Sequence, residues 1–509
     1  MKNRILGGYE PAAVLAFFED ICAIPHVSGD ERAVADYIEA FARERGLACY
    51  RDEVNNVFVR RPASAGHENA PAVMLQGHTD MVGERDADST HNFATDGLAL
   101  RVLSRDGADW IAATGTTLGG DDGVAVAMML AVLDNPPEPH PALECLFTVS
   151  EEVGLEGAWA FDPARAGATA TTVINLDSEA EGVVTAGCAG GVRTDLALPV
   201  TAEPACGVAV TVALEGFSGG HSGVEIHEGH ANAIKLLSRL LRAAECAEGG
   251  GRLCAVSGGG KDNAIPRDAR ATLVLPADGV EAFARAVADE AERIRREPNT
   301  IAADKDFSCS VQVSETPAYM MSEAGHRATL AAIDFIPNGV LSMSAHVEGL
   351  VAYSRNLGIL QTKTDGEGRP VQVILSASTR SASASHIDDA QRELEALAGV
   401  LSAVAGAPVS ATHRARYPGW DYAPASLLRD RWMAASEVLF AVKPHIEVIH
   451  AGLECGILSD KMAAALGVTP DIISVGPDMR DIHTPREMLS IPSVERTYRL
   501  LCHVLSELA

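Results

Sequence analysis

The first 190 residues alternate between helical and extended patterns of apolar side chains. Residues 13–24 and 31–46 carry apolar positions three and four apart, which predicts two amphipathic helices. Three shorter apolar runs predict buried strands, at 72–77, 143–150 and 171–177. Between the first two strands, the apolar run 123–135 predicts a buried helix. This order of elements is typical of an α/β domain.

The pattern changes between residues 195 and 390. Extended runs at 207–216 and 269–276 interleave there with helical runs at 229–245 and 280–297. We interpret 195–390 as an α+β module inserted into the first domain. The module is long enough for two copies of a common α+β unit.

The α/β pattern returns after this module. It is carried by a helix at 387–406, a strand at 471–476 and a closing helix at 493–508. The predicted organisation therefore has three parts along the chain: the first part of an α/β domain (1–194), the insert (195–390) and the second part of the α/β domain (391–509).

The length and net charge of the chain restrict the classes of function that it can have. The chain has 509 residues, enough for more than one domain, and its 41 Lys and Arg against 69 Asp and Glu give a net charge of −28. That charge repels phosphate and argues against a nucleic-acid or anionic-membrane partner. The 10 cysteines form no C-x-x-C pair, and the longest apolar run, 124–133, is far shorter than a membrane span. We expect a cytoplasmic protein.

Histidines and carboxylates gather where the apolar runs end. They are His78 and Asp80, Glu151 and Glu152, Asp177, and His483, with Asp121 and Asp122 before the apolar helix. In open α/β sheets, ligands bind at the carboxyl ends of the strands. Carboxylates packed there without a cation would repel one another, and a divalent metal pair would remove the repulsion. The H-x-D pair alone does not decide between a metal ligand and a turn.

Several motifs resemble those of one known family. "GHTDMV", "TTLGGDDG", "SEEVGLEGA", "NLDSE" and "DIHTPRE" resemble the M20 co-catalytic zinc peptidases. "GGHSGVEIHEGHANAIKLL", "DNAIPRDA" and "HAGLECGIL" most resemble its aminoacyl-histidine (Xaa-His) dipeptidase branch, and the resemblance runs through nearly the whole chain. It implies a zinc-peptidase-like catalytic domain, with a central mixed sheet flanked by helices, and an inserted α+β lid.

The resemblance also implies roles for the clustered residues. His78 and Asp177 would hold one zinc ion, Glu152 and His483 the other, and Asp121 would bridge them. Glu151 would be the general base for a metal-activated water, and Asp80 would orient His78. The residues alone do not choose between Asp121 and Asp122, or between Glu151 and Glu152. Two Zn²⁺ ions per chain are expected, although Mn²⁺ and Co²⁺ suit the same ligands.

The insert supplies further candidates through the same resemblance. His221 would stabilise the oxyanion, and we expect it to act within its own chain, because the large insert could supply both halves of that arrangement; a homodimer through another surface stays open. Arg380 would bind the substrate's terminal carboxylate, and Asn263 and Asn356 are further candidate substrate contacts. Glu454 lies in the catalytic half and would receive a free α-ammonium group.

The leading hypothesis is a cytosolic di-zinc dipeptidase that hydrolyses unblocked Xaa-His dipeptides, such as carnosine. One alternative keeps the fold and changes the substrate: an M20 deacylase acting on N-acyl amino acids. Another is a non-catalytic peptide- or metal-binding protein on the same scaffold. The expected partners are small dipeptides, with no nucleic acid and no membrane.

Overall fold

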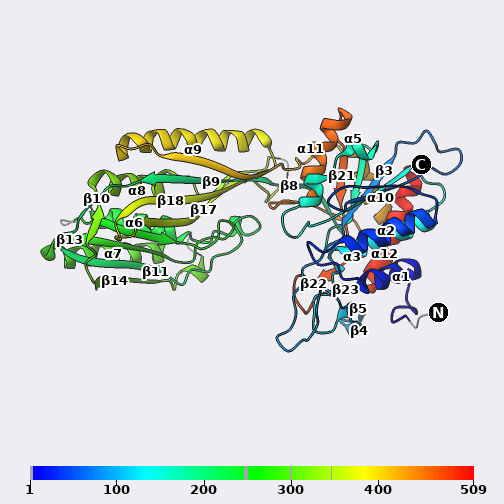
Figure 1. Ribbon diagram of the computed structural model, residues 1–509, viewed down its shortest axis with the longest axis horizontal. Helices are drawn as coiled ribbons and strands as arrows, with labels where there is room; N and C mark the ends of the chain where they lie inside the picture. The colour runs from blue at the N-terminus through cyan, green and yellow to red at the C-terminus, as the bar shows by residue number, and fades with distance from the viewer. Residues whose placement is uncertain (1–3, 246–249, 298–300, 346) are drawn as a thin grey trace. The chain divides into compact units, whose positions relative to one another are not determined.

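A computed structural model describes residues 4–245, 250–297, 301–345 and 347–509 (Figure 1). The chain forms two compact units. The first unit comprises Met1–Cys188, Trp420–Val448 and Leu453–Ala509, and the second comprises Ala189–Gly419 and Ile449–Gly452. The chain thus leaves the first unit and returns to it, as expected for an inserted module. No helix in the described part of the chain is long and apolar enough to cross a bilayer.

An eight-stranded mixed sheet forms the centre of the first unit, in the order β1-β2-β6-β3-β7-β21-β8-β20. Its bounds are β1 (Ala48–Arg51), β2 (Val57–Arg61), β3 (Val73–His78), β6 (Leu143–Thr148), β7 (Thr172–Asn175), β8 (Val183–Cys188), β20 (His445–Ile449) and β21 (Asp471–Ser474). The four adjacent strands β6, β3, β7 and β21 run parallel to one another. Their carboxyl ends therefore meet at one edge of the sheet.

Helices build the main core of the first unit around this sheet. They are α1 (Ala12–Cys22), α2 (Arg32–Glu44), α3 (Gly120–Asp134), α10 (Leu427–Phe440) and α12 (Ile491–Glu507). Helix α3 is buried along almost its whole length, which explains why its sequence is apolar on every side. In Figure 1, α5 (Pro163–Ala166) and α11 (Glu454–Leu466) lie on the other side of the sheet from α1 and α3. The α/β architecture is confirmed.

A smaller sheet lies beside the helices of the first unit, in the order β22-β23-β5-β4. Its strands are β4 (Leu100–Arg105), β5 (Ala108–Ala113), β22 (Met479–Arg480) and β23 (Met488–Ser490). It joins segments from both ends of the chain, because β23 pairs with β5. The loop between β22 and β23 carries His483.

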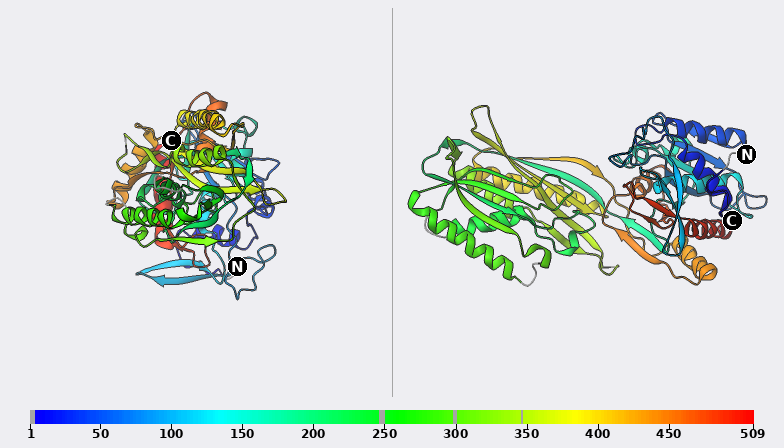
Figure 2. Two further views of the ribbon diagram at one scale, coloured as in Figure 1. Left: turned by 90° about the vertical axis from the view of Figure 1, so that its left-hand side faces the viewer. Right: turned by 90° about the horizontal axis from the view of Figure 1, so that it is seen from below.

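The second unit is built on an antiparallel sheet whose order is β14-β11-β13-β12-β17-β18-β9-β19, with β16 paired to β17. These strands can be followed in Figure 2. They are β9 (Gly190–Pro199), β11 (Val208–Glu215), β12 (Arg252–Gly258), β13 (Ala269–Leu275), β14 (Ser308–Ser314), β16 (Gly339–Met343), β17 (Val351–Thr364), β18 (Pro370–Ser381) and β19 (Ser410–Tyr417). Four helices share its core: α6 (Ala233–Glu245), α7 (Val280–Arg296), α8 (Glu323–Phe335) and α9 (Ala384–Ala405).

The two halves of this sheet repeat one arrangement of elements. One half consists of β11-α6-β12-β13-α7-β14, and the other of β9-α8-β17-β18-α9-β19, with the first half inserted in the chain between β9 and α8. In both halves the fourth strand lies at the outer edge, beside the first, and the second strands β12 and β17 pair at the centre. Each half therefore has the same strand order.

The bounds of the second unit differ from the predicted insert of 195–390. Helix α9 and strand β19, which continue to residue 417, pack on β9 and β18 and so belong to the second unit (Figure 1). From the sequence, residues 391–419 were predicted to belong to the α/β domain, because α9 has the same kind of helical pattern as the helices of that domain. That pattern cannot show which sheet a helix covers.

Candidate active site

The parallel strands deliver the predicted side chains to one place. His78 ends β3, Glu151 and Glu152 follow β6, and Asp177 follows β7. His483 lies beyond β21, in the loop after β22, and its side chain is 44% exposed. Ser150 and His483 have positive φ values of 52° and 58°, a conformation that costs non-glycine residues energy and clusters at functional sites.

Asp121 lies between the two histidines. Its Oδ1 is 3.0 Å from His78 Nε2, and its Oδ2 is 3.1 Å from His483 Nε2. The His78 Nε2 atom is also 3.6 Å from Asp177 Oδ1, and the His483 Nε2 atom is 2.8 Å from Glu152 Oε1. The side chains thus form two groups, each with one imidazole and one carboxylate, that share Asp121.

Asp122 has a different environment. Its Oδ2 accepts the His78 backbone N–H at 3.2 Å, and its buried Oδ1 has no partner among the described residues. Burial and the charge of Asp177 hold its pKa well above the ordinary value. Asp121, and not Asp122, therefore faces both imidazoles.

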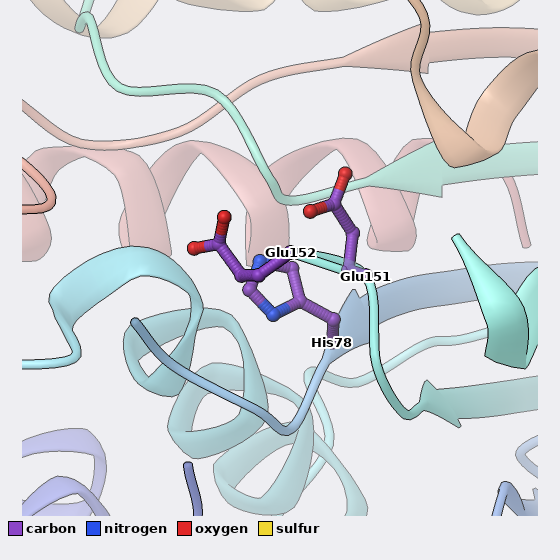
Figure 3. Close-up of side chains that lie close together, drawn as sticks. All are labelled: His78, Glu151 and Glu152. Carbon is purple, nitrogen blue, oxygen red and sulfur yellow. The ribbon is translucent and has the colours of Figure 1, made fainter. Parts of the chain in front are cut away.

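Glu151 and Glu152 occupy consecutive positions but differ in their contacts. Figure 3 shows both side chains near the His78 ring, and the three residues can bring their ligand atoms within 4.8 Å of one another. Glu152 contacts His483, whereas Glu151 contacts neither histidine through a hydrogen bond among the described residues. Burial and the charge of Asp177 raise the pKa of Glu151 to about 9. A carboxyl group with a raised pKa holds a proton readily, as a general acid–base residue must.

The remaining groups show how strongly the charges interact. Burial raises the pKa of Asp177 to about 7. Hydrogen bonds to Asp121 and Glu152 raise the pKa of His483 to about 10. For His78, burial opposes the charged form, but Asp177 and Asp121 outweigh it and hold the pKa well above the usual range. Among the described residues, only these histidines form ion pairs with Asp121, Glu152 and Asp177.

A divalent metal pair fits this donor set. Two imidazoles and three carboxylates are grouped within ligand distance of one another, and none of these carboxylates pairs with Lys or Arg in the described part of the chain. The buried Oδ1 of Asp122 has no partner among the described residues, so a polar atom at this edge is left unsatisfied by the protein.

Asp80 supports both His78 and the neighbouring loop. The His78 Nδ1 atom lies 3.0 Å from the Asp80 carbonyl oxygen and 3.3 Å from its carboxylate Oδ1. The same carboxylate accepts the backbone N–H groups of Glu151 and Glu152 and the Ser28 hydroxyl. One carboxylate therefore fixes a histidine and the loop that carries two glutamates.

Two further glutamates, which the sequence analysis missed, hold the site loops. Buried Glu487 accepts backbone N–H groups of Leu118 at 2.8 Å, Gly119 at 3.1 Å, Gly120 at 2.8 Å and Asp121 at 3.4 Å. It thereby joins the His483 loop to the segment that presents Asp121. Glu31 accepts the backbone N–H and hydroxyl of Ser150, directly before Glu151. Only the "HTPRE" motif, which includes Glu487, hinted at either role.

Of the candidates of the second unit, His221 and Asn263 lie in neighbouring loops, whereas Asn356 lies in β17 and Arg380 in β18. The segment at His221 pairs with the segment at Asn263, since Ser222 donates its N–H to the Asn263 carbonyl at 2.9 Å. Asn356 is buried and donates to the carbonyls of Asp262 and Ala264, so its amide supports the Asn263 loop. Its predicted contact with substrate stays a prediction.

Glu454 begins α11 in the first unit and is fully buried, at 0% exposure. Its Oε2 accepts hydrogen bonds from Gln76 at 2.6 Å and Thr148 at 2.7 Å. Its Oε1 has no partner among the described residues, and burial raises its pKa to about 7. No part of Glu454 is exposed to solvent, so the structure shows no open position for an α-ammonium group beside it. The predicted contact with that group stays a prediction.

Comparisons with known proteins agree with this geometry. Residues 212–300 match a family model described as a peptidase dimerisation domain, and residues 56–197 match one described as peptidase family M28. The chain is 35% identical over 508 residues to the cytosol non-specific dipeptidase of Escherichia coli K12, covering 99% of both chains. It is 33% identical to the crystal structure of aminoacylhistidine dipeptidase from Vibrio alginolyticus, with a TM-score of 0.88 and coverage of 99% and 98%.

A more distant likeness concerns the fold alone. An aminopeptidase structure from Bacillus cereus has a TM-score of 0.58 at 15% identity, covering 98% of this chain and 99% of that one. Fold and site together define a metallopeptidase, an enzyme that hydrolyses peptide bonds. The chain belongs to the M20 family of peptidases.

We predict that Glu487→Gln weakens metal binding about 10- to 100-fold, the range seen when groups that orient metal ligands are lost. An amide has one acceptor oxygen in place of two, so the segment at Asp121 loses part of its support. Chelator competition with zinc on the folded variant would measure the change. Glu156→Gln, at an exposed glutamate of α4 (Glu156–Ala160), is the matched control. Equal affinities in both variants would contradict the role given to Glu487.

We predict that metal-free protein loses stability as pH rises from 7 toward the Glu151 pKa of about 9. The folded state keeps a proton that the unfolded chain has released, so the free energy of unfolding falls as pH increases. His483 acts in the same direction, because its pKa is also raised. Denaturant titrations in chelator would show the slope, and Glu151→Gln should reduce it. A slope of the opposite sign would contradict the prediction.

Proposed function

We propose that this peptidase is a di-zinc dipeptidase that hydrolyses unblocked dipeptides, preferentially of the Xaa-His type. The observation that carries the proposal is the position of Asp121 between two imidazole–carboxylate groups. The names of the Escherichia coli and Vibrio alginolyticus relatives support a dipeptidase, and the second includes aminoacylhistidine.

In this proposal His78 and Asp177 hold one zinc ion, Glu152 and His483 hold the other, and Asp121 contacts both. Asp80 keeps the His78 ring in place through its Nδ1 atom. When bound, the metal pair supplies Lewis-acid polarisation of the peptide carbonyl and lowers the pKa of a water molecule.

Glu151 moves the proton in the reaction. It takes a proton from the attacking water onto its carboxylate and passes that proton to the nitrogen of the departing amine. Its raised pKa without metal reflects burial among carboxylates, and a cation nearby would favour the charged form that accepts the proton. The Glu151 backbone N–H donates a hydrogen bond to the Asp80 carboxylate, which keeps the Glu151 side chain at the site.

His221 would donate a hydrogen bond to the oxygen of the tetrahedral intermediate. Its Nδ1 accepts the backbone N–H groups of Gly223 at 3.3 Å and Val224 at 3.1 Å. In a neutral imidazole the proton then sits on Nε2, which becomes the donor. Burial and the charge of Arg380 lower the pKa of His221 and favour this neutral form.

The substrate termini would be bound by charged groups. Arg380 suits the terminal carboxylate, and Asn263 and Asn356 are further candidates for contact with substrate; the Asn356 amide donates to the Ala264 carbonyl, next to Asn263. Glu454 is the candidate for the free α-ammonium group, because its Oε1 has no partner among the described residues. These roles separate a dipeptidase from an enzyme for N-acylated amino acids.

For location and assembly, we propose a cytosolic homodimer. A cytosolic location agrees with the name of the Escherichia coli relative. The match of residues 212–300 to a peptidase dimerisation domain supports a homodimer. Whether His221 serves its own chain or a partner would follow from the activity of mixed dimers that carry complementary inactive variants.

We predict that Glu151→Gln lowers kcat by about 10²- to 10⁴-fold, the usual contribution of a general acid–base group, while zinc content stays unchanged. Glu152→Gln provides the comparison at the next position, and it should lose metal as well as activity. Turnover and metal content of the same samples would separate the two roles. Normal turnover by Glu151→Gln would disprove its assignment as the base.

The substrate class is tested with zinc-loaded protein and a panel of substrates. The panel contains β-alanyl-His, several α-dipeptides, a tripeptide and N-acetyl-His, with products separated by chromatography. We expect histidine to be released from the unblocked dipeptides and not from N-acetyl-His. Cleavage of N-acetyl-His at an equal rate would indicate a deacylase. No cleavage of any substrate by zinc-loaded protein would indicate a binding protein.

A further inference from the structure

Arg380 is a buried cation without an anionic partner. It ends β18 in the second unit, is 8% exposed, and forms no ion pair with any carboxylate in the described part of the chain. A buried charge is costly unless it is paired. The guanidinium is therefore available to bind an anion that is not a side chain of the second unit.

One edge of this guanidinium is already occupied and the other is free. Its Nη1 donates a hydrogen bond to the Tyr417 hydroxyl oxygen at 3.0 Å. Its Nε is buried and has no partner among the described residues. A carboxylate binds bidentately to the edge formed by Nε and Nη2, which is the edge that Tyr417 leaves open.

Gly223 keeps space beside this free edge. A Cβ at position 223 would lie 3.1 Å from Arg380 Nε and 2.4 Å from the His450 carbonyl oxygen. Any side chain there would cover the edge. The adjacent Ser222 hydroxyl is also buried and has no partner among the described residues. Two unpartnered donors thus flank a position that only glycine leaves open.

The neighbouring imidazoles do not neutralise Arg380. Burial and the charge of Arg380 lower the pKa of His450 to about 4, and its Nε2 lies 2.7 Å from the Ser354 hydroxyl. His450 is therefore neutral at physiological pH. Because neither it nor His221 carries a negative charge, the positive charge of Arg380 remains available.

A bulge in β19 directs Tyr417 toward Arg380. Arg414 pairs with Arg193 and Tyr417 pairs with Gly191, so β19 advances three residues where β9 advances two. The extra residue is accommodated with a positive φ of 49° at Ala415. Bulges of this kind change the direction of a side chain next to functional sites.

Two glycines clamp the tyrosine. A Cβ at Gly191 would lie 2.7 Å from the Tyr417 hydroxyl oxygen, and a Cβ at Gly452 would lie 2.9 Å from its ring. The side chain thus has little room to move, and its hydroxyl is held where it meets Nη1.

We propose that Tyr417 is a positioning residue for substrate binding: its hydroxyl holds Arg380 so that the Nε–Nη2 edge faces the terminal carboxylate of the dipeptide. This inference rests on the proposed function, in which Arg380 binds that carboxylate. Tyr417 itself touches no substrate. Its contribution is to remove the rotational freedom that a long side chain would lose on binding.

The test compares dipeptides with their C-terminal amides, which lack the carboxylate. In Tyr417→Phe the ring and its packing are kept and only the hydroxyl is lost. We expect KM for β-alanyl-His to rise about tenfold, with kcat within about twofold, as for loss of one hydrogen bond to a charged group. The kcat/KM for β-alanyl-histidinamide should stay unchanged.

Tyr353→Phe is the matched control. The Tyr353 hydroxyl accepts a hydrogen bond from Arg355 Nη2 at 3.0 Å in the same sheet, but Arg355 is paired with Glu393. This variant should keep wild-type KM values for both substrates. Thermal unfolding of both variants would show whether each is folded.

The outcomes separate two failures. Arg380→Gln should abolish the preference for the free carboxylate, and if it does not, Arg380 is not the anchor and the proposed substrate binding fails. If Arg380→Gln abolishes the preference but Tyr417→Phe leaves KM unchanged, the role of Tyr417 is refuted alone. An equal rise of KM for dipeptide and amide in Tyr417→Phe would also refute it, since that indicates a general packing effect.

Discussion

The arrangement depends on the repulsion among carboxylates that follow strands β6 and β7 and that begin helix α3. Asp121, Glu151, Glu152 and Asp177 converge there, and no Lys or Arg pairs with them in the described residues. The two histidines alone cannot balance this charge. Hydrogen bonds to three neighbouring carboxylates hold these loops together. Asp80, Glu31 and Glu487 each accept more than one backbone N–H group. Such a site is specified for a multivalent cation before any ligand arrives.

The second unit contains a buried group of the opposite charge. Its sheet repeats one strand order in two halves, and at the end of β18 it buries a single guanidinium among neutral partners. Tyr417, His450 and Ser354 satisfy neighbouring polar atoms without supplying negative charge. The second unit thus keeps a buried positive charge that no carboxylate pairs with in the described part of the chain.

Local pattern predicted the elements well, because helices and buried strands have distinct apolar periods. It also made His78, Glu152, Asp177 and His483 candidates, since these follow apolar runs, and Asp121, which precedes one; in the structure these side chains lie together. It could not find Glu487, whose partners lie more than 360 residues away in the chain, nor Tyr417, which depends on a bulge against β9. Nor did the motif around Asn356 show that its amide supports the Asn263 loop; its contact with substrate stays a prediction. Long-range contacts of this kind leave no periodic signal.

The shared carboxylate of Asp80 has a consequence for how this sequence can change. It fixes the ring of His78 and also the backbone of Glu151 and Glu152, so three functional positions depend on one side chain. Substitutions at these positions should not be independent in evolution: the fitness effect of changing one depends on the state of the others. Drift across this segment is then restricted to coordinated replacements, whereas the exposed positions of α4 are free to vary singly.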